Sequence, residues 1–313
     1  MIDFKLKKDF LFIESPLQLL NAYEAVNYFK LSSYRIIIRL SGKKNNDNQL
    51  LHLIAFLQIK EFEIININAK EKNFIDFCKI FFFICKYTCN SLISDRIFLG
   101  NFGAGFFSIL LKIYNKNKVI LLDDGSKTLS IQRSFSNINY YTLFSLYSLR
   151  PIKNQRIYKN RYSMTLNMLN DLDRKTDGKS VLFLGAKIAE IGMVKEEYYL
   201  SLMKEISIYY SAFNIIYIPH REENPFKLEL ISQYLNIKVK KIDYPVELYG
   251  IYENIIPVKV ASFFSTALIT MMNIYKLDVE SFCFDYSSVK NKKSLDELYD
   301  YQEKYMSVIK LVI

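Results

Sequence analysis

Three short polar clusters in this 313-residue chain carry side chains that could perform acid–base or phosphate chemistry. In the first, "VILLDDGSKT", Asp123, Asp124 and Gly125 follow an apolar run. Adjacent strand residues point to opposite faces, but the glycine permits a sharp turn, so one carboxylate can enter a cleft while the other anchors the turn. A carboxylate in a partly dry cleft beside another acid gains proton affinity and can act as general base toward a hydroxyl. An ordinary Asp-Gly turn is the alternative.

The second cluster is "NIIYIPHREENP", where Pro219, His220 and Arg221 follow an apolar run. A protonated imidazole at a strand end could hydrogen-bond a phosphate oxygen and donate its proton to a leaving group. A purely structural histidine is the alternative. The other histidine, His52, lies in the helical stretch "QLLHLIAFLQ", and we predict no functional role for it.

The third cluster is "VASFFSTALITMM", where Ser262, Ser265 and Thr266 lie at a change from strand to helix. Hydroxyl groups and free backbone amides at a helix N-terminus bind phosphate well. Simple N-capping uses the same residue types and is the alternative.

A further polar stretch opens the chain at "FIESPLQLLNAYEA". Glu14 and Ser15 end a predicted strand, and Gln18 and Asn21 lie on the following helix with side chains available for polar contacts in a cleft. A capped helix with proline in its first turn is the alternative.

The elements that must position these clusters alternate between strands and helices, which is typical of parallel sheets with crossover helices. In the first half the predicted strands are 9–15, 34–40, 62–68, 96–100 and 118–125. The predicted helices of this half are 16–30, 47–58, 71–89 and 103–115. Residues 126–150 are predicted to leave the sheet as a loop, and a polar connection with one helix follows at 150–180.

A second set of elements begins after this connection. Its predicted strands are 180–186, 214–221, 237–243, 254–261 and 279–286, and its predicted helices are 194–211, 225–235 and 264–275. The sequence therefore predicts two doubly wound, Rossmann-like α/β domains, residues 1–160 and 161–285. Residues 286–313 are expected to form a helix that packs back on the first domain, because the second sheet appears complete without them. Open α/β sheets bind ligands beyond the carboxyl ends of their strands, so two such domains facing each other would form a central cleft.

The chain carries a formal charge of +10 with a pI near 9.1. A basic protein suits an anionic donor, an anionic glycan or an anionic membrane surface. Nucleic acid is disfavoured, because the lysines are scattered and no aromatic RNA-binding signature or zinc-finger spacing occurs. The charged N-terminus lacks the features of a signal peptide, so we predict a cytoplasmic protein.

Four cysteines, Cys78, Cys85, Cys89 and Cys283, lack metal-ligand spacing and are predicted to be free, buried thiols, with no bound metal. Three of them lie in "FIDFCKIFFFICKYTC", residues 74–89. This apolar segment predicts a core helix or a homodimer interface. Shallow peripheral contact with the inner face of the cytoplasmic membrane is the alternative.

The order of the three clusters, "DDG" at 123–125, "PH" at 219–220 and "ST" at 265–266, resembles that of bacterial sialyltransferases. The opening "ESPLQLLNAYEA" resembles the lipooligosaccharide sialyltransferases of glycosyltransferase family 52 and the related bacterial polysialyltransferase-like proteins. Together these stretches span residues 14–266. The sequence departs from the usual pattern in two places, because proline precedes the histidine here and the serine pair is Ser-Thr.

This resemblance implies a GT-B fold and an inverting, metal-independent transfer without a cofactor. Sialic acid or a related nonulosonic acid would pass from a CMP-activated donor to a hydroxyl of a cell-surface glycan, such as lipooligosaccharide or capsule. Asp124 or its neighbour Asp123 would deprotonate the acceptor, and His220 would assist the leaving phosphate. Ser265 and Thr266 would hold that phosphate.

Lesser candidates and other functions stay open. Glu247, in "YPVELYG", and Glu14 are candidates for contacts with the nucleotide ribose or base. A GT-B enzyme that uses CMP-Kdo or a nucleotide-diphosphate hexose would need similar groups. A non-catalytic, basic glycan-binding protein would fit the charge alone.

Overall fold

The computed structural model describes residues 8–68, 74–91, 94–102, 107–134, 138–173, 175–235, 237–287, 289 and 292–312. The chain divides into two compact units, Met1–Met164 and Thr165–Ile313, close to the predicted boundary at 160/161. No described helix is long and apolar enough to cross a bilayer.

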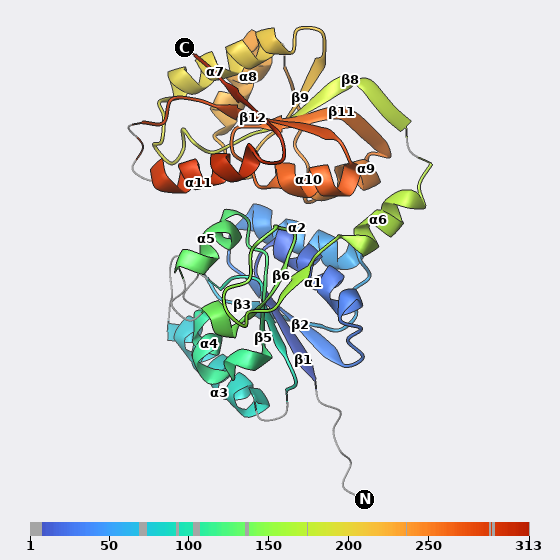
Figure 1. The fold of residues 1–313 in the computed structure, drawn as a ribbon, viewed down its shortest axis with the longest axis vertical. Helices are drawn as coiled ribbons and strands as arrows, with labels where there is room; N and C mark the ends of the chain where they lie inside the picture. Colours follow the sequence, from blue (N-terminus) through green and yellow to red (C-terminus); the bar gives the residue numbers. More distant parts are fainter. Residues whose placement is uncertain are drawn as a thin grey trace, which may run out of the picture. The chain divides into compact units, whose positions relative to one another are not determined.

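A parallel sheet of seven strands, in the order β3-β2-β1-β4-β5-β6-β7, forms the first unit. Its strands are β1 (Asp9–Ile13), β2 (Tyr34–Leu40), β3 (Phe62–Asn66), β4 (Ile97–Leu99), β5 (Val119–Leu122), β6 (Thr142–Ser145) and β7 (Ile157–Lys159). Its helices are α1 (Pro16–Tyr28), α2 (Lys44–Phe56), α3 (Phe74–Ser91), α4 (Leu110–Ile113) and α5 (Ser126–Ser134), with short 3₁₀ helices η1 (Phe107–Ile109), η2 (Lys116–Lys118) and η3 (Ile138–Tyr140). Helices lie on both sides of the sheet (Figure 1), which explains why β1, "DFLFI", is buried along its whole length.

A parallel sheet of six strands, in the order β10-β9-β8-β11-β12-β13, forms the second unit. Its strands are β8 (Lys175–Leu184), β9 (Asn214–Ile218), β10 (Lys238–Val239), β11 (Ile255–Ser262), β12 (Asp278–Cys283) and β13 (Ser307–Lys310). Its helices are α7 (Glu196–Tyr209), α8 (Pro225–Leu235), α9 (Tyr249–Tyr252), α10 (Ala267–Tyr275) and α11 (Lys292–Gln302), with the 3₁₀ helix η4 (Val246–Leu248). The helix α6 (Ser163–Asn170) spans the boundary between the units. The prediction of two doubly wound α/β domains is confirmed.

Each unit has its own aromatic core. In the first, Phe12 lies in edge contact with Phe83 and Tyr87, at ring centroid separations of 5.9 and 5.0 Å. In the second, Phe183 packs against Phe263 and Phe282, at 5.4 and 6.2 Å. Such pairs stabilise a core beyond the burial of their area.

Two predictions about the elements of the first unit are wrong. Residues 126–150 form α5 and β6 rather than a loop, and β7 extends the sheet further. These strands were missed because they are only three or four residues long. Part of the predicted helix 103–115 lies outside the described residues, and the rest forms η1 and α4 instead of one continuous helix.

The C-terminal segment also differs from its prediction. It forms α11 and then β13, which pairs with β12, so the second sheet does not end at residue 286. Within this unit Tyr299 Oη donates to Phe282 O at 2.9 Å, and Ser281 Oγ donates to Gln302 Oε1 at 2.8 Å. The prediction of a helix alone is therefore wrong, because α11 and β13 both belong to the second unit and β13 extends its sheet.

Candidate functional site

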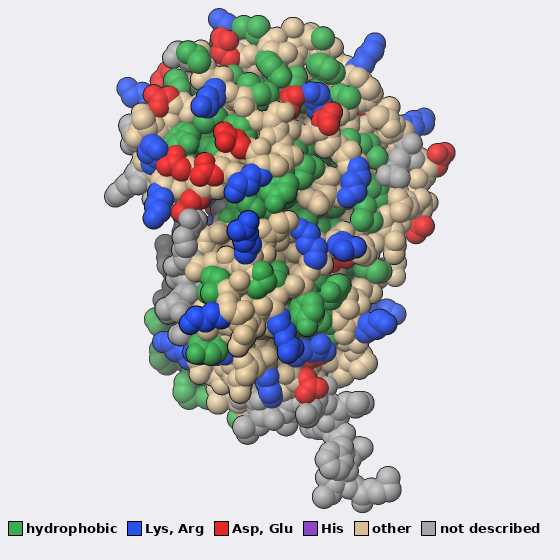
Figure 2. Space-filling view, in the orientation of Figure 1, with side chains coloured by type: hydrophobic (Ala, Val, Ile, Leu, Met, Phe, Trp, Pro, Cys, Tyr) green, Lys and Arg blue, Asp and Glu red, His purple; other side chains and the backbone are tan. Residues whose placement is uncertain are grey.

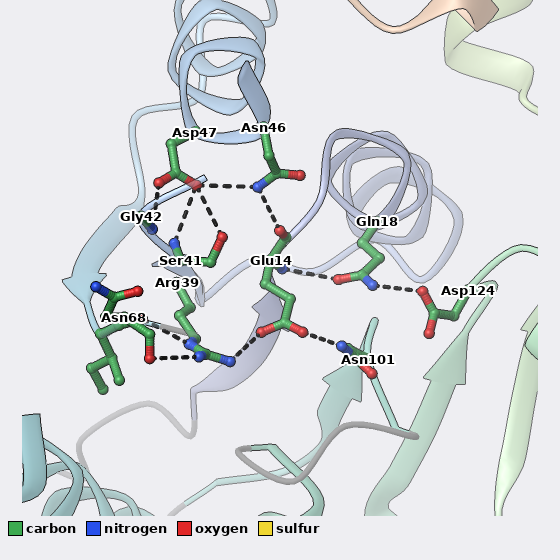
Figure 3. A network of polar contacts seen from close by, with 11 residues as sticks. Glu14, Gln18, Arg39, Ser41, Gly42, Asn46, Asp47, Asn68, Asn101 and Asp124 are labelled. Atoms are coloured by element: carbon green, nitrogen blue, oxygen red, sulfur yellow. Dashed lines mark hydrogen bonds and ion pairs between the residues drawn. The ribbon is translucent and has the colours of Figure 1, made fainter. Parts of the chain in front are cut away.

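The carboxyl ends of the central strands in the first sheet carry a connected set of polar side chains (Figure 3). Glu14 follows β1, Arg39 lies near the end of β2, Asn101 follows β4, and Asp124 follows β5. Neighbouring parallel strands end at the same edge of a sheet, so these residues meet there. We call Glu14, Gln18, Arg39, Asn101 and Asp124 the first polar edge.

A buried ion pair lies at the centre of the first polar edge. Arg39 Nη1 is 2.7 Å from Glu14 Oε2, and their side chains are only 7% and 13% exposed. Arg39 also donates to the carbonyl oxygens of Ile67, at 3.2 Å, and Asn68, at 3.4 Å, and Asn101 Nδ2 donates to Glu14 Oε1. Buried charges are costly unless hydrogen bonds satisfy the groups that remain. These contacts give Glu14 a structural role in the edge.

Gln18 links this ion pair to Asp124. Ser15 caps α1 by accepting a hydrogen bond from Gln18 N at 3.4 Å, and Pro16 occupies the first helical position. The capped helix directs the Gln18 side chain back over the strand ends, where its Oε1 accepts from Glu14 N at 2.9 Å. Its Nε2 donates to Asp124 Oδ1 at 2.8 Å. Of the predicted cleft residues, Ser15 is therefore a cap and Gln18 orients Asp124.

The two adjacent aspartates have different environments. Asp123 is 3% exposed and accepts hydrogen bonds of 2.6 Å from Ser145 Oγ and from Leu146 N. Burial raises the pKa of its carboxyl to about 6, although both hydrogen bonds act in the opposite direction. Its carbonyl oxygen accepts from the buried Asn21 Nδ2 at 3.1 Å. Asp123 and Asn21 therefore anchor the turn that follows β5.

Asp124, in contrast, reaches the surface. Gly125 has a φ of +60°, which lets the chain turn directly after Asp124. The Asp124 backbone N donates to Thr128 Oγ1 at 2.8 Å, while Oδ2 lies 3.1 Å from Lys127 Nζ. Its side chain is 15% exposed and keeps lone pairs for a ligand. Of the two acids, Asp124 is therefore the one that a ligand can reach.

An apolar cavity of about 540 Å³ lies elsewhere in the first unit. It is bounded by residues of α2, of β3 and of the segment between them: Leu51, Ile54, Ala55, Gln58, Ile59, Lys60, Phe62 and Ile64. These residues contribute almost no polar groups and lie away from the strand ends that carry the first polar edge. We assign no reaction to this cavity.

In the second unit, His220 lies just beyond the carboxyl end of β9. Its backbone N donates to Glu223 Oε2 at 2.6 Å, and its carbonyl oxygen accepts from Glu223 N at 2.9 Å. Its ring Nδ1 accepts from Glu222 N at 3.2 Å, which places the proton of a neutral ring on Nε2. Burial, with Lys187 and Arg221 nearby, lowers the pKa of His220 to about 4. Without a ligand the imidazole is therefore neutral at pH 7, and an approaching phosphate would raise its pKa.

A buried polar cluster around Glu223 holds the backbone of His220 in place. Glu223 Oε1 accepts from Tyr217 Oη at 2.6 Å and lies 2.7 Å from the ammonium of the fully buried Lys227. Gly185 directly follows the neighbouring strand β8, and a Cβ there would lie 2.2 Å from Glu223 Oε2. The close approach of the two strand ends thus requires glycine at this position.

The serine cluster divides in the same way as the aspartate pair. Ser262 is fully buried and donates to Leu184 O at 2.7 Å, so it ties β11 to β8. Ser265 and Thr266 are half-buried at the start of α10, where Ser265 Oγ accepts from Ala267 N at 3.2 Å. Thr266 is the N-cap residue, but its side chain makes no capping hydrogen bond. Ser265 and Thr266 can therefore face a ligand, whereas Ser262 serves the sheet.

Glu247 is a buried acid in η4, after β10. It is 5% exposed, and burial raises the pKa of its carboxyl while the charge of Arg221 opposes this. Tyr275 Oη fixes the segment by donating to Glu247 O at 2.9 Å. A hydrogen bond from its own backbone amide also acts to lower the pKa of the Glu247 carboxyl.

Three residues of these edges were not predicted: Arg39, Asn101 and Glu223. Arg39 gives a signal in retrospect, because a charged residue near the end of the apolar run "RIIIRL" must find a buried partner. Among the described residues, no three His, Cys, Asp or Glu side chains converge on a position that could hold a metal ion.

Several solved structures resemble the whole chain. The UDP-GlcNAc 2-epimerase of Methanocaldococcus jannaschii, in complex with UDP-GlcNAc and UDP, is 13% identical with a TM-score of 0.61, over 97% of this chain and 88% of that chain. UGT89C1 of Arabidopsis thaliana, complexed with UDP-L-rhamnose, is 9% identical with a TM-score of 0.55, over 99% and 86%. The GT-B domain of the Photobacterium damselae sialyltransferase is 9% identical with a TM-score of 0.51, over 97% and 100%.

No protein-family model matches the sequence, and no curated protein matches it. The fold is nevertheless clear, because both units are Rossmann-like parallel α/β units and the structural similarity extends over nearly the full chain. The chain has the GT-B fold.

Proposed function

We propose that this protein is an inverting glycosyltransferase that moves sialic acid or a related nonulosonic acid from a CMP-activated donor to a glycan hydroxyl. The observation that carries the proposal is the environment of His220, whose ring is fixed with its proton on Nε2 at a strand end of a GT-B fold. Such a hydrogen-bond donor would stabilise the charge on a departing nucleotide monophosphate. The order of the acid, histidine and hydroxyl motifs supports the same donor class.

In the proposed reaction the first unit handles the acceptor. Asp124 takes the proton of the acceptor hydroxyl, and the oxygen attacks the anomeric carbon from the side opposite the CMP group. Gln18 holds the Asp124 carboxylate in place through a 2.8 Å hydrogen bond. General-base assistance of this kind typically contributes about 10²–10⁴-fold to a rate.

The second unit binds the donor in this proposal. The bond between the anomeric carbon and the phosphate oxygen breaks, its electron pair remains on that oxygen, and His220 Nε2 donates a hydrogen bond to the departing phosphate. The hydroxyl groups of Ser265 and Thr266 donate hydrogen bonds to the other phosphate oxygens. The Glu247 carboxylate accepts hydrogen bonds from the ribose. Hydrogen bonds would then replace the cation used where a diphosphate departs.

A second candidate is a GT-B enzyme that uses a nucleotide-diphosphate sugar. Two of the similar structures hold UDP-sugars, which favours this candidate over others. A panel of CMP-sialic acid, CMP-Kdo and UDP-GlcNAc separates the two, because only the true donor is hydrolysed or transferred. We expect CMP release from CMP-sialic acid. Turnover of UDP-GlcNAc alone would instead establish the second candidate.

No turnover of any sugar nucleotide, together with salt-sensitive binding to anionic glycans, would indicate a non-catalytic glycan-binding protein. The lipooligosaccharide or capsule acceptor belongs to the proposal through the sequence resemblance. It can be tested once the donor is known.

A further inference from the structure

The helix α3 is apolar on two sides, and only one of them is covered. Phe83 and Tyr87 face the core and are 4% and 0% exposed. The opposite side carries large apolar side chains that are 59–81% exposed: Phe74, Ile75, Phe77, Phe81 and Phe82. We call these five residues the exposed α3 stripe. Surface helices normally present polar side chains on their outer face, so a stripe of this kind marks an interaction surface. The prediction of a core helix is therefore wrong for this side of α3.

The orientation of α3 is fixed, so the exposed stripe cannot turn inward. Tyr87 packs in edge contact with Phe10 and Phe12, at centroid separations of 5.4 and 5.0 Å. Tyr114 Oη donates to Tyr87 O at 3.1 Å, and Lys79 Nζ donates to Asn66 O at 3.0 Å. Rotating the helix to bury the stripe would expose this aromatic core. In Figure 2, apolar side chains reach the surface at the lower left, where Figure 1 places α3.

The prediction that the cysteines are buried is also wrong. Cys85 and Cys89 are exposed on α3, while Cys78 and Cys283 are half-buried, and all four are free thiols. The outer side of α3 thus combines phenylalanine, isoleucine and cysteine over its whole length.

The charged side chains of α3 and of the segment 107–118 are mostly basic. In α3 and in the segment 107–118, which includes the adjacent α4, the sequence has a single acid, Asp76, and it is buried. The same two segments contain five lysines: Lys79, Lys86, Lys112, Lys116 and Lys118. One of them, Lys86, pairs with Glu63 at 2.6 Å. The others agree with the overall charge of +10 and favour an anionic partner.

We propose that the exposed α3 stripe inserts into the headgroup–acyl boundary of an anionic lipid bilayer and holds the first unit against it. Phenylalanine and isoleucine side chains enter this boundary when a helix lies in its plane, and nearby lysines are attracted to anionic headgroups. A second copy of the chain fits less well. Pairing two stripes would bring the lysines of both copies together, and α3 offers no exposed carboxylate to neutralise them.

The test is co-sedimentation of the full chain with vesicles of phosphatidylcholine, with and without phosphatidylglycerol. We expect the wild-type chain to bind the anionic vesicles, and the double variant Phe81→Glu, Phe82→Glu to bind at least tenfold more weakly. A matched control is Phe226→Glu, Tyr234→Glu on α8, where the two aromatic side chains are 60% and 77% exposed. This control should bind within about twofold of the wild type.

Two results would overturn the inference. One is equal vesicle binding by the stripe variant and the wild type. The other is a wild-type dimer in light scattering that the stripe variant converts to monomer, with no vesicle binding by either, which would identify a second copy as the occupant. Release of CMP from CMP-sialic acid in detergent-free buffer should be unchanged in the stripe variant. The membrane inference and the donor chemistry can therefore fail separately.

Discussion

The first polar edge and the edge that carries His220 hold their reactive groups in opposite ways. In the first unit, a buried arginine and the side-chain amides of Gln18 and Asn101 hold the carboxylates of Glu14 and Asp124 at the ends of the strands. In the second unit, burial and nearby cations keep the imidazole neutral, while a buried glutamate fixes its backbone. The first edge therefore presents hydrogen-bond acceptors. The second presents a hydrogen-bond donor, and its pKa would rise on the approach of an anion.

The largest expected effect on activity comes from the pair Asp123 and Asp124. Asp124→Asn should lower transfer by about 10²–10⁴-fold, because it removes the proposed base. Its stability should change little, since its ion pair with Lys127 is largely exposed on the lysine side. The measurement is the initial rate of transfer alongside the midpoint of urea unfolding.

Asp123→Asn is the matched control for this variant. An asparagine amide cannot accept hydrogen bonds from both Ser145 and Leu146, so we expect a loss of about 1–3 kcal/mol in the free energy of unfolding. The remaining folded protein should keep most of its turnover. A reversal, with Asp123→Asn folded but inactive and Asp124→Asn active, would assign the base to Asp123.

The buried ion pair between Arg39 and Glu14 should contribute strongly to the free energy of unfolding. Arg39→Met leaves Glu14 as an uncompensated buried charge, and we expect unfolding to become easier by about 3–5 kcal/mol. The control is Arg35→Met on the same strand, whose 3.2 Å contact with Glu61 is exposed and should contribute about 0–1 kcal/mol. Similar losses in both variants, from chemical denaturation, would mean that the pair has no special role.

Asp123 in the first unit and His220 in the second should change stability with pH in opposite directions. The pKa of Asp123 is raised from 3.8 to about 6, so its contribution is present below pH 4 and is lost as pH rises to 6, by about 3 kcal/mol. The pKa of His220 is lowered from 6.5 to about 4, so stability increases with pH over nearly the same range. In Asp123→Asn the free energy of unfolding should therefore increase with pH over this range. In His220→Asn it should decrease with pH. Parallel curves for the two variants in urea unfolding at pH 4–7 would contradict these environments.

The glycine beside Glu223 should not tolerate a side chain. Gly185→Ala should cost about 1–3 kcal/mol in the free energy of unfolding, because the new methyl group would overlap the Glu223 carboxylate and the Tyr217 hydroxyl. Gly178→Ala, in the preceding strand β8, is the control, since nothing lies within 4 Å of a Cβ there. If both substitutions leave the unfolding midpoint unchanged, the packing of Glu223 and Tyr217 against Gly185 is less tight than these distances indicate.

The sequence predicted the features that depend on local patterns. The apolar run before "DDG" predicted a strand with polar groups at its end, and Ser15 and Pro16 predicted the start of α1. The pairing of Glu14 with Arg39 was not predictable, because it depends on how two strands align in the folded sheet. The exposure of the α3 stripe was not predictable either, since both sides of that helix are apolar and the sequence does not say which one meets the core.

The division of roles within each cluster also required the structure. Asp123 and Asp124 are identical side chains, and only the turn at Gly125 separates the buried anchor from the surface carboxylate. Ser262 and Ser265 differ in the same way, because β11 ends between them. The sequence motifs therefore located polar segments at strand ends, but they did not show which residues of each segment are buried.

Calorimetric titration of CMP into the wild-type chain and into Asp124→Asn and His220→Asn tests the central claim most directly. We expect CMP to bind the wild type more tightly than UMP or UDP, with unchanged affinity in Asp124→Asn and an affinity lowered about tenfold or more in His220→Asn. Binding of UDP in preference to CMP, or equal CMP affinity in all three proteins, would contradict a CMP-sugar site at the His220 edge.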